Sequence, residues 1–385
     1  MKEILGSTAE LLHGVCAPPK SFNKEPSAFS KPSCLKRSLL SFSPTPNRWK
    51  SITKTTRSLK TSCSNQALID SDKLIRRIEK MMAPGTGGLS GLFPLGDSYL
   101  VASTDSVGTK VELASETQIH DTIGIDLVAT SVNDIVSFGA EPLYFRAYHV
   151  MCSNRPKIMV KVEKSIIVGC SQSNCAIFCG KIEEMPGCHV EVEYCLGGFA
   201  VGKVKKDSLI DGKNIIAGDV LVGLPSNGVH CNGFSLVRRV LAQSGLSFKD
   251  QIPGGSGKPI TLGEALMAPT VNYVQQVLHI IGKGEVKGIA HITSGGLTAS
   301  IPRVFPRGLG AAIYQDSWEV SAVFKWIQEA GRIDDVEMRS TFNMGIGMVL
   351  VVSPDASARI LGEPHGGYLA YRIGEVTGKE GVTYQ

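Results

Sequence analysis

A carboxylate, a glycine, a hydroxyl and a lysine stand within six residues of one another at Asp105, Gly108, Thr109 and Lys110. They follow residues 99–102, which have the pattern of a short strand. Asp can hold a divalent metal ion, glycine lets backbone N–H groups approach phosphate, and lysine neutralises phosphate charge. The spacing favours nucleotide binding, although a polar loop without a ligand has the same residue types.

A second acidic position lies in residues 122–138, whose apolar residues recur at helical spacing. Asp134 follows Leu127 by seven residues and so falls near the apolar face of this predicted helix. A buried carboxylate needs a partner or a metal ion, whereas one at the edge of the stripe reaches water. Beside a second acidic segment, Asn133 and Asp134 favour metal–phosphate binding.

Two further segments carry residues of the same kind. Residues 180–187 follow a predicted buried strand and contain Glu184, which could hold Mg²⁺ between phosphate oxygens or lie in a solvated turn. Residues 225–233 form a polar loop before a predicted helix, an arrangement that favours anion binding. His230 and Asn232 in this loop are candidates for contacting a phosphorylated substrate or moving a proton.

The elements that must position these residues alternate between strands and helices, which predicts an α/β (α+β) fold. The chain has 385 residues, of which 43% are hydrophobic, enough for two cores. We predict a domain boundary in the polar, turn-rich residues 205–218 and treat residues 247–263 as a surface insertion. Strands are expected at 143–150, 176–179, 196–204, 219–224, 287–292, 346–352 and 370–376, and helices at 71–82, 122–138, 157–172, 234–243, 271–282 and 321–330.

The basic charge of the chain is confined to its first part. Residues 1–64 contain 11 Lys or Arg and three Glu, whereas the remainder contains 29 basic and 32 acidic residues. A mildly acidic body does not predict binding to nucleic acid, and no apolar run is long enough to cross a membrane. The basic, Ser-rich, acid-poor segment 1–65 predicts a chloroplast or mitochondrial transit peptide, with a plain disordered extension as the alternative.

The order of these motifs resembles the aminoimidazole ribonucleotide synthetase family. The similar segments lie between about residues 74 and 380: 104–110, 120–128, 132–135, 184–187, 198–202, 228–236, 287–293, 301–304, 323–328 and 341–348. The C-terminal segments distinguish this family from thiamine-monophosphate kinases and selenophosphate synthetases, which share the fold.

The resemblance implies a two-domain fold, a reaction and a set of ligands. The N-terminal synthetase domain, 66–206, would use its sheet to form a homodimer, and the C-terminal α/β domain would span 207–385. The expected reaction is the ATP-dependent cyclisation of formylglycinamidine ribonucleotide to 5-aminoimidazole ribonucleotide through an iminophosphate, a step of purine synthesis. ATP, Mg²⁺ and K⁺ are the cofactors that the family suggests.

The resemblance also distributes roles over the residues named above. Asp105, Gly108, Thr109, Lys110 and Asn133 would bind the nucleotide. Asp105, Asp134 and Glu184 would hold the metal ion. His230, Asn232 and Asp134 would act at the substrate.

Several residues at expected ligand positions depart from the family pattern. Lys181 and Ile182 stand where the family usually has Glu and Thr, and Ala147 and Cys195 where it usually has Asp. Lys181 would repel a metal ion unless it contacts phosphate instead. Ser106, Ser294 and Ser300 replace Gly, Gly and Asn, and a serine in a left-handed conformation would cost about 1 kcal/mol. An active cyclo-ligase, a catalytically impaired paralogue kept as a binding or dimer partner, and another phosphotransferase on this fold are the three hypotheses.

Overall fold

The computed structural model describes residues 91–185, 193–255, 259–362 and 369–385. All of them lie within one of two compact units, residues 68–385. The predicted transit peptide and the predicted helix at 71–82 lie outside the described residues. Among those described, no helix combines the length and the apolar character needed to cross a bilayer.

The N-terminal half is built on a five-stranded sheet in the order β1-β2-β5-β3-β4. The strands are β1 (Leu92–Leu95), β2 (Ser98–Ser106), β3 (Glu141–Met151), β4 (Ala176–Glu184) and β5 (Tyr194–Lys205). Neighbours are antiparallel except β3 and β4, whose parallel pairing requires the crossover helix α4 (Pro156–Gln172). The short helix α2 (Lys110–Thr117) follows β2.

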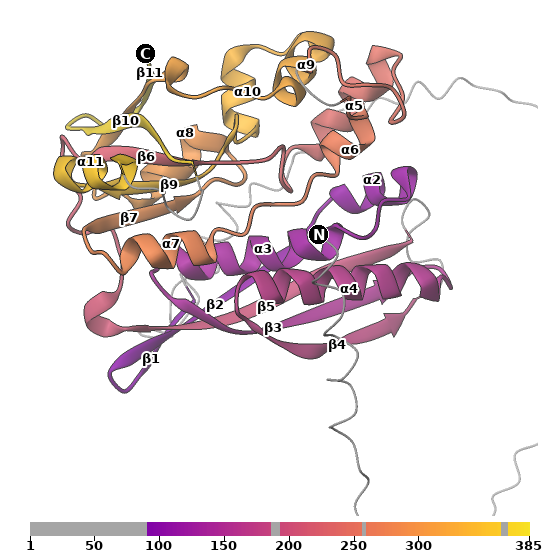
Figure 1. Cartoon of the computed structure of the whole chain (residues 1–385), viewed down its shortest axis with the longest axis horizontal. Coiled ribbons are helices and arrows are strands. Elements are labelled where there is room, and N and C mark those ends of the chain that lie inside the picture. Colours follow the sequence, from indigo (N-terminus) through magenta and orange to yellow (C-terminus); the bar gives the residue numbers. More distant parts are fainter. Residues whose placement is uncertain (1–90, 186–192, 256–258, 363–368) are drawn as a thin grey trace, which may run out of the picture. The chain divides into compact units, whose positions relative to one another are not determined.

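Helices α3 (Ile123–Val136) and α4 lie side by side on one face of this sheet (Figure 1). They approach closely because small residues stand at their contact. An added Cβ at Gly124 would lie 2.4 Å from Ser165 Oγ, and the Gly124 N–H donates a hydrogen bond to that hydroxyl. Nearly every residue of α3 is buried, so this helix must satisfy neighbours on both sides.

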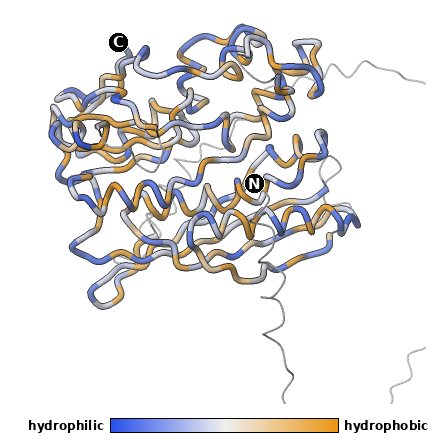
Figure 2. Tube along the Cα trace, viewed as in Figure 1, coloured by the Kyte–Doolittle hydropathy of each residue, from blue (hydrophilic) through white to orange (hydrophobic). Residues whose placement is uncertain are grey.

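The C-terminal half contains a six-stranded sheet in the order β11-β8-β10-β6-β9-β7. Its strands are β6 (Val220–Pro225), β7 (Val286–His291), β8 (Gly310–Ile313), β9 (Ile346–Val352), β10 (Tyr371–Thr377) and β11 (Gly381–Tyr384). The helices are α5 (Phe234–Ser244), α6 (Leu262–Leu266), α7 (Val274–Ile281), α8 (Gly296–Ser300), α9 (Ala322–Gly331), α10 (Asp335–Thr341) and α11 (Pro354–Gly362). Strand β9 is buried throughout, and hydrophobic residues run through the strands of this sheet in Figure 2.

These two sheets confirm the mixed α/β, two-part fold expected from the sequence. Two expected loops, however, are strands. Strand β2 continues through Asp105 to Ser106, and β4 continues through Lys181 to Glu184. The predicted boundary at residues 205–218 falls between the end of β5 and the start of β6.

The other face of the N-terminal sheet carries exposed aromatic residues. Phe199 on β5 pairs with Arg146 on β3, and Arg146 pairs with Phe178 on β4, so these three side chains lie on the same face. Tyr148, Phe178 and Phe199 are 40–56% exposed. We call this surface, which is opposite α3 and α4, the open face.

Glycine inside β5 reflects the close approach of α3. An added Cβ at Gly202 would lie 2.3 Å from Ile135 Cγ2 and 2.7 Å from the Glu141 carbonyl oxygen. We therefore expect Gly202→Ala to lower the free energy of unfolding by about 1–3 kcal/mol through overpacking. Gly378→Ala is the matched control, because only Ala217 Cβ, at 4.0 Å, lies near that position. Equal urea midpoints for the two variants would contradict this packing argument.

Candidate active site

The polar face of α3 joins the two halves of the described chain. Asp126, Thr130, Asn133 and Asp134 recur at intervals that place them on one side of the helix. Each contacts a residue beyond position 225, from the loop after β6, the segment before α7, or the end of β7. The candidate site is assembled along this face.

A fully buried ion pair stands at the N-terminal end of this face. Lys110 Nζ lies 2.8 Å from Asp126 Oδ1, and both side chains are 0% exposed. Asp126 Oδ1 also accepts hydrogen bonds from the Thr270 N–H at 2.7 Å and the Thr270 hydroxyl at 2.6 Å. Lys110 Nζ donates a second bond to the Ala268 carbonyl oxygen at 2.8 Å. One carboxylate oxygen therefore gathers helix α2, helix α3 and the segment before α7.

Only some residues of the segment predicted to bind nucleotide, 105–110, remain available for a ligand. Lys110, expected to neutralise phosphate, is instead committed to Asp126 and Ala268 inside the protein. Gly108 is exposed, has a φ of +53°, and has open space around an added Cβ. Thr109 is partly exposed and caps α2 without a side-chain hydrogen bond. Gly108, Thr109 and the partly exposed Asp105 are thus the members of the segment that remain accessible.

Asn133, also predicted to bind nucleotide, bridges to the segment before α7. Its amide nitrogen donates to the Val271 carbonyl oxygen at 2.9 Å, and its amide oxygen accepts from the Tyr273 N–H at 3.0 Å. Asn133 is fully buried, so its amide group cannot bond to water. These two hydrogen bonds supply the partners that a buried polar group needs.

Asp105 and Asp134 form an acidic pair beside His291. Asp134 Oδ1 lies 2.8 Å from His291 Nδ1, and its other oxygen accepts from the Ser103 hydroxyl at 3.1 Å. Burial and then the neighbouring Asp134 charge raise the pKa of Asp105, whereas its bond from the Ser106 N–H and the nearby His291 act in the opposite direction. The Asp134 side chain is 41% exposed. Of the two alternatives for this carboxylate, burial with a partner or a position at the edge of the apolar stripe that reaches water, the second is correct.

Glu184, the third predicted metal ligand, is distant from this pair within one chain. Asp105 lies on β2 and Glu184 on β4, with β5 and β3 between them. Adjacent strands are about 4.8 Å apart, so these two strands are separated by about 14 Å. Among the described residues, no group of three or more His, Cys, Asp or Glu side chains is placed to hold a metal ion.

The loop after β6 is held in place by His230, which was predicted to act at the substrate. His230 is buried with a φ of +62°, a conformation that is strained for a residue other than glycine. Its Nε2 accepts a bond from the Val271 N–H at 3.5 Å, while Nδ1 is buried without a hydrogen-bond partner among the described residues. Burial and the nearby His291 and Lys110 hold the pKa of His230 well below its usual value. A neutral imidazole fits a positioning role here better than proton transfer.

The two residues that follow His230 differ in environment. Cys231 Sγ lies 3.4 Å from Thr270 Oγ1 and 3.5 Å from Asp126 Oδ1, and burial raises the pKa of this thiol to about 12. Asn232 is partly exposed and makes no side-chain hydrogen bond to another described residue. Asn232 is therefore the accessible polar residue of the predicted pair.

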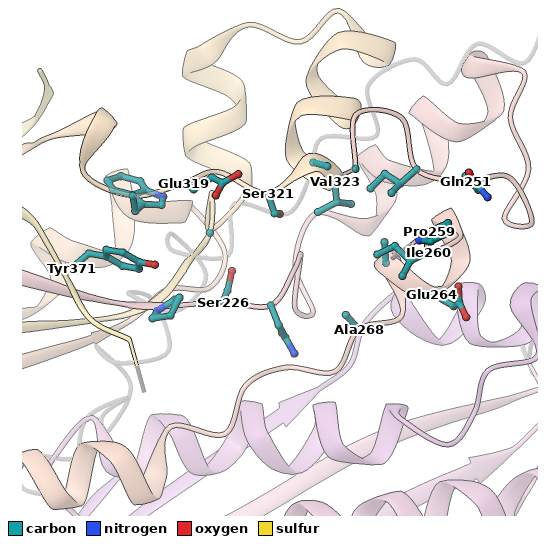
Figure 3. Close-up of a pocket in the computed structure, with 18 residues that line it drawn as sticks. Ser226, Gln251, Pro259, Ile260, Glu264, Ala268, Glu319, Ser321, Val323 and Tyr371 are labelled. Carbon is teal, nitrogen blue, oxygen red and sulfur yellow. The ribbon is translucent and has the colours of Figure 1, made fainter. Parts of the chain in front are cut away.

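A cavity of about 780 Å³ lies beside the start of this loop (Figure 3). Its walls include Ser226, Gln251, Glu264, Trp318 and Tyr371, which come from five separate segments. None of the residues predicted to form the site lines it. The sequence feature that could have pointed to this cavity is the predicted insertion at 247–263, because it supplies one wall.

Comparison with known proteins identifies the family. Residues 90–204 match the AIR synthase related protein N-terminal domain, and residues 217–385 match the corresponding C-terminal domain. The chain belongs to this family. It is 64% identical over 314 residues to the chloroplastic phosphoribosylformylglycinamidine cyclo-ligase of Arabidopsis thaliana, covering 81% of this chain and 80% of that protein. The chloroplastic/mitochondrial cyclo-ligase of Vigna unguiculata is 65% identical over 312 residues, covering 81% and 79%.

Solved structures agree on the fold. The structure of AaThiL complexed with AMPPCP and TMP has a TM-score of 0.58 and 16% identity, covering 81% of this chain and 92% of that one. At this identity the likeness shows the fold alone. The chloroplastic and mitochondrial relatives confirm the expected organellar location of this AIR synthase family member.

The substitutions at expected ligand positions leave the backbone unstrained. Ser106 and Ser294 are absent from the residues with positive φ, so replacing glycine there costs no left-handed strain. Ser300 is buried, and its hydroxyl has no partner among the described residues. Lys181 and Arg146 border a hollow on the open face. Ala147 is also among its lining residues, but it is 3% exposed and, between Arg146 and Tyr148, its side chain lies on the opposite face of the sheet.

Removing the lysine of the buried pair should be strongly destabilising. Lys110→Met leaves the Asp126 carboxylate buried without its cation, and we expect the free energy of unfolding to fall by about 3–5 kcal/mol. The double variant Lys110→Met/Asp126→Leu should lose less, because it removes the charge along with its partner. Urea denaturation measures both, with the exposed Lys203→Met as control; a loss below about 1 kcal/mol for Lys110→Met would contradict the proposed importance of the pair.

Stability should fall in mild acid because three histidines are buried in neutral form. Burial lowers the pKa of His120 and His149 to about 4, and that of His230 also lies well below its usual value. Below about pH 6.5 these histidines are protonated in the unfolded chain but stay neutral in the folded chain. The free energy of unfolding therefore has its full value above that pH and falls as the pH drops toward 4. His149→Phe should reduce this slope by about 1.4 kcal/mol per pH unit. Urea midpoints between pH 7.5 and 4.5 test this; an unchanged slope would show that His149 does not remain neutral.

Proposed function

We propose that this chain catalyses the ATP-dependent cyclisation of formylglycinamidine ribonucleotide to 5-aminoimidazole ribonucleotide. The observation that carries the proposal is 64–65% identity, over 81% of the chain, to two plant cyclo-ligases. The polar face of α3 supports it, because it brings an acidic pair and the loop at 225–233 into one assembly. The reaction belongs to purine synthesis in the organelle.

The reaction proceeds by activation of an amide oxygen. That oxygen takes the γ-phosphoryl group of ATP, which gives an iminophosphate and ADP. A nitrogen of the same molecule then attacks the activated carbon, the C–O bond to phosphate breaks, and the imidazole ring closes with loss of a proton. Catalysis of this kind depends chiefly on position and on charge neutralisation.

We assign the substrate side to the loop after β6 and the nucleotide side to the end of β2. Asn232 supplies an accessible amide for the substrate, while buried His230 fixes the loop against Val271. Gly108 and Thr109 offer backbone N–H groups near the start of α2, and Asp105 with Asp134 supplies negative charge beside His291. Lys110 and Asn133 support the site by joining its parts.

The nucleotide is supported more strongly than the metal ions. Structural neighbours were solved with AMPPCP, and the family is one of ATP-dependent ligases. For Mg²⁺, the described part of one chain offers the Asp105–Asp134 pair without a third ligand, and Ala147 and Lys181 cannot attract a cation. We therefore assign no step to Mg²⁺ or K⁺.

We also propose that the chain forms a homodimer through the open face. Phe178, Phe199 and Tyr148 expose aromatic surface on a sheet whose opposite face is already covered by helices. Apolar patches of this kind are covered in stable proteins by another surface. A second copy offers an identical sheet for this purpose.

Turnover tests the assigned function directly. We expect the purified full chain to release ADP with ATP, Mg²⁺, K⁺ and formylglycinamidine ribonucleotide, and to release little when the ribonucleotide is omitted. Asp105→Asn/Asp134→Asn should reduce the rate by at least about 100-fold, the scale on which charged active-site groups act. Lys181→Glu/Ile182→Thr restores the usual family residues and is assayed in parallel. If only that variant showed turnover, the proposal of an active enzyme would be rejected in favour of a catalytically impaired paralogue.

A further inference from the structure

The loop after β6, residues 225–233, has a backbone conformation that costs free energy. His230 and Gly233 have φ values of +62° and +84°, in the left-handed region that favours glycine. For His230 this conformation is strained, because its Cβ is crowded there. A strained backbone persists only where the surrounding structure determines it. The contacts that this loop makes therefore decide its shape.

Asn343, in the turn before β9, bonds to this loop at two points. Its amide oxygen accepts a hydrogen bond from the Ser226 hydroxyl at 2.8 Å, and its amide nitrogen donates to the Gly228 carbonyl oxygen at 2.9 Å. The same amide oxygen accepts from the Gly345 N–H at 2.9 Å, which fixes the side chain relative to its own turn. Asn343 is 4% exposed, so water cannot readily replace these partners. One buried side chain thus joins two loops of the C-terminal half.

Two other contacts hold the start of the same loop. The Ser226 N–H donates to the Gly345 carbonyl oxygen at 2.8 Å, and the Tyr273 hydroxyl donates to the Pro225 carbonyl oxygen at 2.8 Å. The bond that the Gly228 carbonyl oxygen accepts lies further along the loop, toward the residues that we assign to the substrate. Loss of that bond would leave the start of the loop attached and release the part beyond it.

The residues that bond to Asn343 also form part of a cavity wall. Ser226 and Gly345 line the cavity of about 780 Å³ shown in Figure 3, and both donate to the Asn343 amide oxygen. Asn343 is not among the lining residues and is buried behind them. Trp318, another lining residue, donates from its indole N–H to the Met344 carbonyl oxygen at 2.8 Å. The turn that contains Asn343 therefore sets both the loop and the wall beside it.

We propose that Asn343 is a positioning residue for the ribonucleotide, because it holds the loop at 225–233 in the shape that presents Asn232 to the substrate. The inference rests on the proposed cyclo-ligase function, which assigns the ribonucleotide to this loop. Asn343 is buried behind Ser226 and Gly345, so it acts through the loop and not by contact with the substrate. It keeps the binding shape populated before the substrate arrives, which lowers the cost of ordering the loop on binding.

Calorimetric titration of the full chain with formylglycinamidine ribonucleotide, and separately with ATP, tests the proposal. If Asn343→Ala lowers the population of the binding shape to about one tenth, the affinity for the ribonucleotide falls about tenfold, because apparent affinity scales with that population. The affinity for ATP should stay within about twofold, since the nucleotide side lies at the end of β2. In turnover, KM for the ribonucleotide should rise more than kcat falls, because bound substrate restores the shape of the loop.

A second variant and a control separate positioning from stability. Asn343→Asp keeps the size and the acceptor oxygen but removes the donor to Gly228, and should lower the affinity for the ribonucleotide by at least about threefold. Ser165→Ala is the matched control, because it removes a buried hydroxyl that accepts from the Gly124 N–H at 2.9 Å where α3 and α4 meet. It should lower the urea midpoint while leaving both affinities within about twofold.

The two affinities distinguish the possible outcomes. A folded Asn343→Ala or Asn343→Asp chain that binds the ribonucleotide as tightly as Ser165→Ala does would overturn the inference and leave the proposed function standing. An equal loss of affinity for ATP would also overturn it, because a general loss of structure would then explain the result. If the unaltered chain binds no ribonucleotide, the proposed function fails and this inference fails with it.

Discussion

The buried pair between Lys110 and Asp126 is the constraint on which the site depends. Two charges removed from water are tolerated only when each is compensated, and here a single carboxylate oxygen meets a lysine, a backbone N–H and a hydroxyl. Thr270, which supplies the N–H and the hydroxyl, lies 144 residues from Asp126 along the chain. The arrangement therefore fixes where the C-terminal segment before α7 crosses α3.

Helix α3 then serves both halves of the described chain. One side packs on the N-terminal sheet and α4 through apolar and small residues. The other side carries Asp126, Asn133 and Asp134, each bonded to the C-terminal half. Polar side chains on this second side are satisfied by specific backbone and side-chain partners, which gives the contact one register where apolar packing alone would allow several.

The sequence anticipated what depends on local periodicity. Helix α3 and strands β3, β5, β6 and β9 were expected within a few residues of their observed ends, because burial imposes a repeat that can be read along the chain. Asp126 was missed because an acid in an amphipathic helix looks ordinary until its distant partner is known. Lys110 was interpreted as a phosphate ligand for the same reason. The register shift between β3 and β4, which falls between Arg146 and Tyr148, depends on how two strands pair, and no local pattern in the sequence contains that information.

Two like charges on the open face have a consequence for assembly. If two copies of the chain pair through this face, Arg146 and Lys181 of each copy enter a region of lower dielectric, where net charge is costly, and only Lys181 has a carboxylate partner, Glu183. Counter-ions screen like charges, so assembly through this face would strengthen as the salt concentration rises. The oligomeric state would then depend on the ionic strength.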